Sequence, residues 1–366
     1  MIYKTSEYVS TGHPDKTADY VSEYILDRLI ELDPKTRYAL EVQIKGNVVS
    51  LAGEITTKAD VTQDDYIQWA KEAINEIGYT KKYQEKFGSK NTICGEECIV
   101  CRNISKQSPN IAEGVDKDAW GDQGIFFGFY CGETKEGHGK DYYLAKKIGQ
   151  ELYQKALASD VLGLDIKTQV TVCYDDIMLD DKISKIICAV PMVEGKEEEG
   201  RKEVLDIVKK YKDGARTQVI INGTGSYCKH GPIADCGTTG RKLVVDFYGG
   251  RSRIGGGSPW TKDGTKADLT LNIFAHELAK QAYFQLEEIQ PHHVEVELSC
   301  CIGQKAVLMQ LTAYDNDGNI IYKNSESQNV APSTLIERYG LSKPIYAKMC
   351  RDGLFTAFSY KKEKKQ

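Results

Sequence analysis

Residues 38–55 read Tyr-Ala-Leu-Glu-Val-Gln-Ile-Lys-Gly-Asn-Val-Val-Ser-Leu-Ala-Gly-Glu-Ile. Apolar and polar side chains alternate along much of this stretch, on both sides of Gly46-Asn47. Alternation with a period of two is typical of a half-buried strand, and a short Gly/Asn connection is typical of a turn. The stretch therefore predicts two adjacent strands, 38–44 and 48–55.

The flanking sequence extends this strand pair into a larger unit. Before it come a short apolar strand at 2–9 and an amphipathic helix, whose apolar side chains recur at the helical positions Ala18, Val21, Ile25 and Leu29. After it come a helix at 64–77 and a strand at 98–104. The unit reads strand, helix, strand, strand, helix, strand.

The same order of elements recurs twice more, at a period of roughly 125 residues. The second unit is predicted at 125–131, 145–156, 168–174, 182–190, 201–211 and 218–222. The third is predicted at 243–248, 271–282, 293–301, 306–314, 333–339 and 354–360.

These units predict an α+β fold of three similar βαββαβ-type domains, residues 1–105, 106–225 and 226–366. A sheet with helices on one face leaves its other face bare. We therefore expect a homodimer built across flat sheet faces.

Composition excludes several classes of protein. A chain of 366 residues is long enough for two or three cores. The formal net charge of −5 gives no global attraction for nucleic acid. The sequence lacks an apolar run long enough to span a bilayer and an apolar signal peptide, so we expect no membrane association and a cytoplasmic location.

The 11 cysteines are expected to be reduced thiols. Cys98 and Cys101 have the spacing of zinc ligands, with Cys94 nearby, but no second pair with suitable spacing follows. Buried thiols on strands are the favoured interpretation, and a structural zinc site is the alternative.

Cationic side chains concentrate beside glycine. Arg241-Lys242 follows the segment 237–240, and Lys262 follows three consecutive glycines at 255–257. Glycine lets backbone N–H groups approach an anion, which Lys or Arg then neutralises. Together with Lys167 and Lys266, these cations predict a polyphosphate site, although any one of them alone could be a solvated surface side chain.

Carboxylates near turns could hold the hard cation that a polyphosphate needs. Asp15, in Gly12-His13-Pro14-Asp15-Lys16, is the first candidate. The alternative for Asp15 is capping of the helix that follows. His13 is a candidate donor or acid. Tyr227 and Trp260 are candidates for stacking on a planar base, although packing within the loop is the favoured interpretation for an aromatic side chain near glycine. The Walker, dinucleotide-binding and nucleophile-elbow motifs are absent.

Six segments resemble the methionine adenosyltransferase (S-adenosylmethionine synthetase) family in order and nearly in spacing. The six segments are residues 12–19, 53–57, 106–109, 121–124, 235–242 and 255–268, and the resemblance extends over the whole chain. The family's fold of three similar α+β domains agrees with the internal repeat.

The resemblance implies that the methionine sulfur attacks the 5′ carbon of ATP. The displaced triphosphate is then hydrolysed to phosphate and diphosphate. It also implies Mg²⁺, two per site, and K⁺, with ATP and L-methionine as substrates. The active sites would lie at the interface of a homodimer, and two dimers could pair into a tetramer.

The resemblance also implies roles for individual residues. The catalytic residues would be His13, Lys167, Arg241 and Lys262. The ATP site would comprise His13, Asp165, Lys167, Ser226, Tyr227, Asp235, Arg241, Lys242, Ser258 and Lys262. Methionine would contact Glu54, Gln107, Asp235 and Lys266. Asp15 and Asp268 would bind Mg²⁺, Glu41 would bind K⁺, and Asp122 would belong to the opposite side of a site shared between subunits.

The chain departs from the family pattern at several positions, which the resemblance locates at the adenine pocket and at the loop over the site. They are Asn110, the segment 222–227, Ile254 and Pro259-Trp260. Two other hypotheses stay open: a nucleotide-binding paralogue without turnover, and an unrelated ATP-dependent phosphotransferase. The intact set of cations and carboxylates argues against the first, and the missing kinase and Walker motifs argue against the second.

Overall fold

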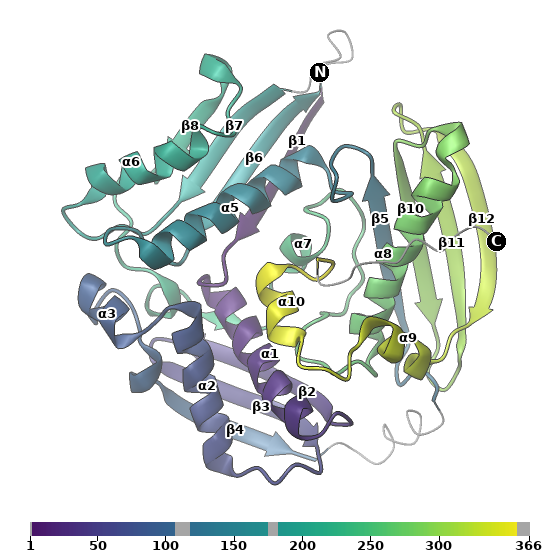
Figure 1. Ribbon diagram of the computed structural model, residues 1–366, viewed down its shortest axis with the longest axis horizontal. Coiled ribbons are helices and arrows are strands. Elements are labelled where there is room, and N and C mark those ends of the chain that lie inside the picture. Colours follow the sequence, from purple (N-terminus) through teal and green to yellow (C-terminus); the bar gives the residue numbers. More distant parts are fainter. Residues whose placement is uncertain (1, 107–117, 175–181, 357–366) are drawn as a thin grey trace.

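The computed structural model describes residues 2–106, 118–174 and 182–356, and these residues form three four-stranded sheets (Figure 1). The first sheet has the order β1 (Ile2–Val9), β6 (Lys167–Tyr174), β7 (Lys182–Ala189) and β8 (Gln218–Ile221). The second runs β4 (Ile99–Ser105), β3 (Val48–Thr56), β2 (Arg37–Lys45) and β9 (Gly237–Thr238). The third runs β12 (Ile320–Asn329), β11 (Ala306–Tyr314), β10 (His293–Cys300) and β5 (Gly124–Cys131).

Each sheet takes one strand from another unit of the sequence repeat. β1 begins the first unit but pairs antiparallel with β6 of the second. β5 begins the second unit but pairs with β10 of the third, and β9 of the third unit pairs with β2 of the first. The three units are therefore interlocked, and segments far apart in sequence meet at their junctions.

One long helix packs against each sheet. α1 (Pro14–Leu32) packs on β2 and β9, α5 (Lys140–Ala158) on β1 and β6, and α8 (Ala267–Gln285) on β5 and β10. The second helices of the units are α2 (Gln63–Ile77), α6 (Glu197–Val208) and α9 (Pro332–Tyr339). Figure 1 shows α1, α8 and α10 (Tyr346–Asp352) lying between the sheets. The elements α3 (Lys81–Phe87) and α7 (Leu243–Asp246) are shorter.

Local sequence explains where α2 begins and ends and where α1 begins. α2 begins with a capping box in which the Thr62 side chain accepts from the Asp65 N–H and the Asp65 side chain accepts from the Thr62 N–H. It ends at Gly78, whose φ of 114° is the left-handed conformation that glycine adopts at low cost. α1 begins with Pro14, where proline's missing N–H costs no hydrogen bond.

The third unit differs from the sequence prediction. The first strand of this unit is expected at 243–248, but these residues contain the short helix α7. The first strand of the unit is instead β9, at 237–238. A short apolar run does not distinguish a strand from a helix. The fourth strand of the third sheet is β12, which is largely exposed and is polar after its first three residues, so it gave no sustained apolar pattern. Residues 354–356 form a turn rather than the start of the expected strand, and 357–360 lie outside the described residues.

The sheet faces that the helices do not cover carry exposed apolar side chains. On the third sheet, Ile125, Ser299 and Leu308 stand in one row across β5, β10 and β11. The Ile125 and Leu308 side chains are 50% and 56% exposed, which is high for large apolar groups within a sheet. No helix in the described part of the chain is long and apolar enough to cross a membrane.

Candidate active site

The N-terminus of α1 places His13 and Asp15 together. His13 is the N-cap residue, and its Nδ1 accepts the Asp15 backbone N–H at 3.2 Å. The alternative that Asp15 caps the helix is therefore wrong, and its carboxylate is available for other contacts. Burial, with the Lys242 charge in addition, lowers the pKa of His13 to about 4. The imidazole is neutral at pH 7, and because Nδ1 accepts, Nε2 carries the proton.

Asp15 binds the cation-bearing loop that follows β9. Its Oδ1 accepts the Thr238 N–H at 3.0 Å, and its Oδ2 accepts from Lys242 Nζ at 2.6 Å. Arg241 Nε lies 3.6 Å from Oδ1. Burial alone would raise the pKa of Asp15, but the Lys242 and Thr238 hydrogen bonds hold it below its usual range. Asp15 is therefore an ionised carboxylate beside two cations.

Asp165 and Tyr227 form a neighbouring pair. Tyr227 Oη donates to Asp165 Oδ2 at 2.8 Å, and the Gly231 N–H donates to the same oxygen at 2.8 Å. Burial raises the pKa of Asp165 to about 6, against the effect of these two donors. Lys167 begins β6 and pairs with Glu7 Oε2 of β1 at 2.7 Å. Because β1 pairs with β6 of the second unit, it fixes the strand end that carries Lys167.

One electrostatic neighbourhood contains these residues. The charges of Lys242, Asp15, Lys167 and Asp235 all act on the pKa of His13. We call this set the first cluster; it comprises His13, Asp15, Asp165, Lys167, Tyr227, Asp235, Arg241 and Lys242. Its cations come from two different units of the repeat and meet at the start of α1.

A second group of predicted residues lines a cavity of about 490 Å³, within the usual range for small-molecule sites. Lys262 Nζ donates to Asp268 Oδ2 at 2.7 Å and to the Ser258 carbonyl at 3.0 Å. Lys266 Nζ lies 3.3 Å from Asp263 Oδ2. We call the predicted residues that line this cavity the second cluster: Glu54, Asp122, Lys262, Lys266 and Asp268.

Glycine allows the close contact on which the second cluster depends. A Cβ on Gly257 would lie 2.0 Å from Asp268 Oδ1, whereas a Cβ on Gly256 would meet nothing within 4 Å. The second of these adjacent glycines therefore has a steric reason to be glycine. It lets the backbone pass directly over the Asp268 carboxylate.

Glu41 lies between the two clusters. Its carboxylate binds two hydroxyls, Thr239 Oγ1 at one oxygen and Thr261 Oγ1 at the other, the latter at 3.1 Å. Thr239 directly follows the residue that binds Asp15, and Thr261 directly precedes Lys262. Carboxylate and hydroxyl oxygens are suitable ligands for a hard cation.

The donor set suits a metal that is bound jointly with phosphate. Among residues 2–106, 118–174 and 182–356, no three His, Cys, Asp or Glu side chains converge as a complete metal site. Asp15 and Asp268 each offer one carboxylate beside a lysine. Magnesium typically takes one or two carboxylates and completes its coordination with water and substrate phosphate oxygens. The residues therefore fit magnesium that arrives with a polyphosphate.

Several predicted residues are placed differently or not described. Ser226 is exposed, and Ser258 contacts Lys262 through its backbone carbonyl. Gln107 and Asn110 lie outside the described residues. Cys94 and Cys98 are buried and Cys101 is exposed, and the described residues place no complete set of zinc ligands around them.

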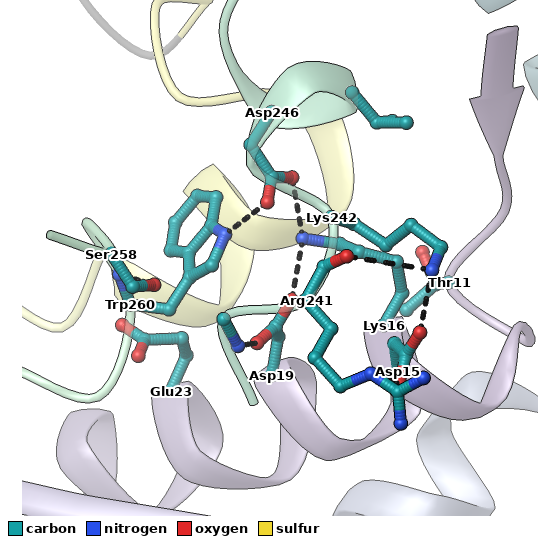
Figure 2. A network of polar contacts seen from close by, with 12 residues as sticks. Thr11, Asp15, Lys16, Asp19, Glu23, Arg241, Lys242, Asp246, Ser258 and Trp260 are labelled. Atoms are coloured by element: carbon teal, nitrogen blue, oxygen red, sulfur yellow. Dashed lines mark hydrogen bonds and ion pairs between the residues drawn. The ribbon is translucent and has the colours of Figure 1, made fainter. Parts of the chain in front are cut away.

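The expectation that Trp260 could stack on a base is wrong, because its side chain is 1% exposed. It belongs instead to a buried network that the sequence did not reveal (Figure 2). Its Nε1 donates to Asp246 Oδ2 at 2.8 Å, and its ring lies 4.6 Å from Lys16 Nζ. Lys16 also pairs with Asp246 at 2.7 Å and with Asp19 at 3.0 Å. The signal in the sequence that could have revealed this network was the presence of charged residues on the buried side of the first helix.

Comparisons with known proteins assign three consecutive parts of the chain to the domains of one family. The S-adenosylmethionine synthetase N-terminal domain matches residues 1–109, its central domain 117–227 and its C-terminal domain 229–364. The S-adenosylmethionine synthase of Acholeplasma laidlawii is 33% identical over 96% of this chain and 93% of its own length. That of Brachyspira hyodysenteriae is 32% identical over the same shares.

A solved structure gives the same result for the fold. The structure described as an unusual S-adenosylmethionine synthetase from Campylobacter jejuni superposes with a TM-score of 0.86. It is 31% identical in sequence, and the match covers 97% of this chain and 94% of that one.

The fold and the clustered cations define a three-domain α+β transferase. The chain belongs to the S-adenosylmethionine synthetase family. Its activity is that of an S-adenosylmethionine synthase; the family binds ATP and methionine and uses metal ions.

Proposed function

We propose that the two clusters carry out the reaction of ATP, L-methionine and water to S-adenosylmethionine, phosphate and diphosphate. The observation that carries this proposal is the concentration of Lys242 and Lys167 around the neutral His13 at the start of α1, with Arg241 beside the neighbouring Asp15. Such a set suits a polyanionic leaving group better than it suits acid–base chemistry.

In the first step a sulfur–carbon bond forms at the ATP 5′ carbon and the bond from that carbon to the triphosphate oxygen breaks. The electron pair leaves with the triphosphate, and the neutral thioether becomes a sulfonium. The nucleophile needs no general base. The residues therefore contribute by orienting both substrates and stabilising charge on the leaving oxygen. In the second step water cleaves the triphosphate.

His13 acts in this proposal as a neutral hydrogen-bond donor. Of the two roles expected for His13, its low pKa favours the hydrogen-bond donor over an imidazolium that protonates the leaving group. The Nε2–H can donate to a triphosphate oxygen next to the breaking bond.

The remaining roles follow the two clusters. Around ATP we place Asp165, Lys167, Ser226, Tyr227, Asp235, Arg241, Lys242, Ser258 and Lys262. Around methionine we place Glu54, Gln107, Asp235 and Lys266. Lys242 and Lys262 bind Asp15 and Asp268 in the free protein, so each cation can turn to phosphate when a metal takes its carboxylate.

We assign magnesium to Asp15 and Asp268 and potassium to Glu41. Magnesium would neutralise phosphate charge and orient the triphosphate chain. Two carboxylates, each beside a phosphate-binding lysine, support two magnesium ions per site. The hydroxyls of Thr239 and Thr261 beside Glu41 support a site for the less demanding potassium ion.

We propose a homodimer with the active sites between subunits. Glu54 and Glu41 are exposed on the uncovered face of the second sheet, where a partner could lie. Asp122 lines the same cavity as Lys262 and Asp268 of its own chain. If Asp122 contributes to the partner's active site, the other residues of the second cluster contribute to that site too. Each active site is then formed by the first cluster of one subunit and the second cluster of its partner. We place this enzyme in the cytoplasm, and the pairing of dimers into tetramers stays open.

The test is a product assay on the purified protein with ATP, methionine, Mg²⁺ and K⁺. We expect S-adenosylmethionine in equal amount to phosphate and to diphosphate, with loss of turnover when Mg²⁺ is omitted and a lower rate when K⁺ is omitted. Release of phosphate without the sulfonium product would contradict the proposal, and ATP binding without any product would favour the paralogue hypothesis.

A further inference from the structure

Four acidic residues stand four positions apart on α1: Asp15, Asp19, Glu23 and Asp27. This spacing puts them on one face of the helix, each about one turn beyond the last. The first three are almost fully buried. We call these four residues the carboxylate stripe.

Every member of the stripe accepts backbone N–H groups from a segment that is distant in the sequence. The Gly240 N–H donates to Asp19 at 2.8 Å, and the Thr261 N–H donates to Glu23 at 2.6 Å. Asp15 accepts from Thr238, as described above, and Figure 2 shows these carboxylates along α1. At the far end, Asp27 accepts from the N–H groups of Tyr346 and Ala347, both at 2.9 Å.

The first three carboxylates bind the two loops that carry the cations. Gly240 precedes Arg241 and Lys242 of the first cluster, and Thr261 precedes Lys262 of the second. The fourth partner is the start of α10, which carries no residue of either cluster. One helix face therefore holds both cation-bearing loops, and its last position provides a natural control.

The backbone at Thr261 needs such support. Its φ is 71°, in the left-handed region that β-branched residues rarely adopt. A strained backbone persists only where its surroundings hold it. Here the Thr261 N–H is held by Glu23, its carbonyl accepts the Leu40 N–H at 3.1 Å, and its hydroxyl donates to Glu41. The residue in this held conformation is directly followed by Lys262.

We propose that Glu23 is a positioning residue for the adenosyl transfer: its hydrogen bond to Thr261 holds the 258–262 loop so that Lys262 faces the cavity. This inference rests on the proposed role of Lys262 and names a residue that touches neither substrate nor metal. Glu23 acts on the reaction only through the loop.

The state of Glu23 decides which variant should preserve this role. Burial raises the pKa of Glu23 well above its usual range, although the Thr261 N–H favours the ionised form. Its Oε2 has no hydrogen-bond partner among the described residues. Glutamine has the same length as glutamate and keeps an acceptor oxygen, so its amide oxygen can accept the same Thr261 N–H.

The experiment compares Glu23→Met, which has a similar length but no acceptor, with Glu23→Gln. We expect kcat of Glu23→Met to fall about tenfold to a hundredfold, because displacing a catalytic group by about 1 Å can lower the rate by this factor. The KM for methionine should change less than kcat, and Glu23→Gln should keep kcat within about twofold. Asp27→Asn is the matched control; it should lower stability but leave kcat unchanged.

A double-mutant cycle separates positioning from general damage. If Glu23 acts through Lys262, Glu23→Met should reduce kcat little further in a Lys262→Met background. An independent, full-sized loss there would overturn the inference, as would a Glu23→Gln enzyme as impaired as Glu23→Met. Should Glu23→Met not fold, an ester in place of the 260–261 peptide removes the same donor from the loop side, with the same expected loss. Full kcat in that ester protein would also overturn the inference.

The proposed function can fail separately from this inference. If Lys262→Met alone turns over normally, the role assigned to Lys262 is wrong whatever Glu23 does. If Lys262→Met is impaired while Glu23→Met is not, the positioning role alone is wrong.

Discussion

At the scale of single residues, the candidate site is built from contacts that only particular side chains allow. Gly257 passes directly over Asp268, and His13 both caps α1 and remains neutral. The sequence predicted the residue types that gather here, since charge beside glycine suggests an anion site. It could not predict that Trp260 would be buried against Lys16, because that contact joins segments about 240 residues apart and depends on packing.

Gly257→Ala should displace the Asp268 carboxylate, because the new Cβ would lie 2.0 Å from its Oδ1. We expect kcat to fall at least about tenfold and a higher Mg²⁺ concentration to be needed for half-maximal rate. Gly256→Ala is the control, since its Cβ meets nothing within 4 Å and should leave both quantities unchanged. Equal activity of the two variants would argue against Asp268 as a site residue.

At the scale of elements, α1 is the helix that organises the site. The sequence predicted it correctly from its apolar positions, which pack inward as expected. The carboxylate stripe was not predicted from the sequence, because a helix with acidic residues every four positions normally presents them to water. These are buried because loops of the third unit supply backbone donors. These contacts could not be predicted, because they depend on how the whole chain folds.

Asp27, the last member of the stripe, makes the stability of the folded protein depend on pH. Burial raises the pKa of Asp27 to about 7, and the backbone donors Tyr346 and Ala347 only partly oppose this. The folded protein then binds more protons than the unfolded chain between about pH 4 and pH 7. This contribution to stability is present at low pH and is lost as the pH rises through 7.

Asp27→Asn removes that titration. We expect the variant to be destabilised most at pH 5, with the difference from the parent protein shrinking by on the order of 2 kcal/mol at pH 8. Urea unfolding at the two pH values measures it. A difference that stays constant, or grows with pH, would show that Asp27 is ionised across this range.

At the scale of the whole molecule, the interlocked sheets bring distant motifs together. The sequence repeat predicted three α+β units, and the sheets have this content. Pairing of β1 with β6, of β5 with β10 and of β9 with β2 was not predictable, since the alternation within a strand does not name its neighbour. The wrong strand at 243–248 has the same cause: an apolar run was assigned without knowledge of its surroundings.

The proposed dimer makes a prediction at this scale. Leu308→Glu places a charge in the exposed apolar row of the third sheet, so it should weaken dimers formed across that face and lower activity in parallel. Leu32→Glu, at a similarly exposed leucine at the end of α1, should stay dimeric and active. Sedimentation equilibrium with a rate assay measures both. A monomeric Leu308→Glu enzyme with full activity would contradict active sites shared between subunits.

The central claim is that cations stabilise a departing triphosphate, and Lys262→Met tests it most directly. Lys262 and Asp268 form an ion pair whose side chains are 22% and 25% exposed, so water can still reach the Asp268 carboxylate when the lysine is replaced. In a single-turnover experiment with saturating ATP and methionine, we predict that S-adenosylmethionine formation slows at least about a hundredfold while thermal unfolding is nearly unchanged. An unchanged rate of sulfonium formation would contradict the account.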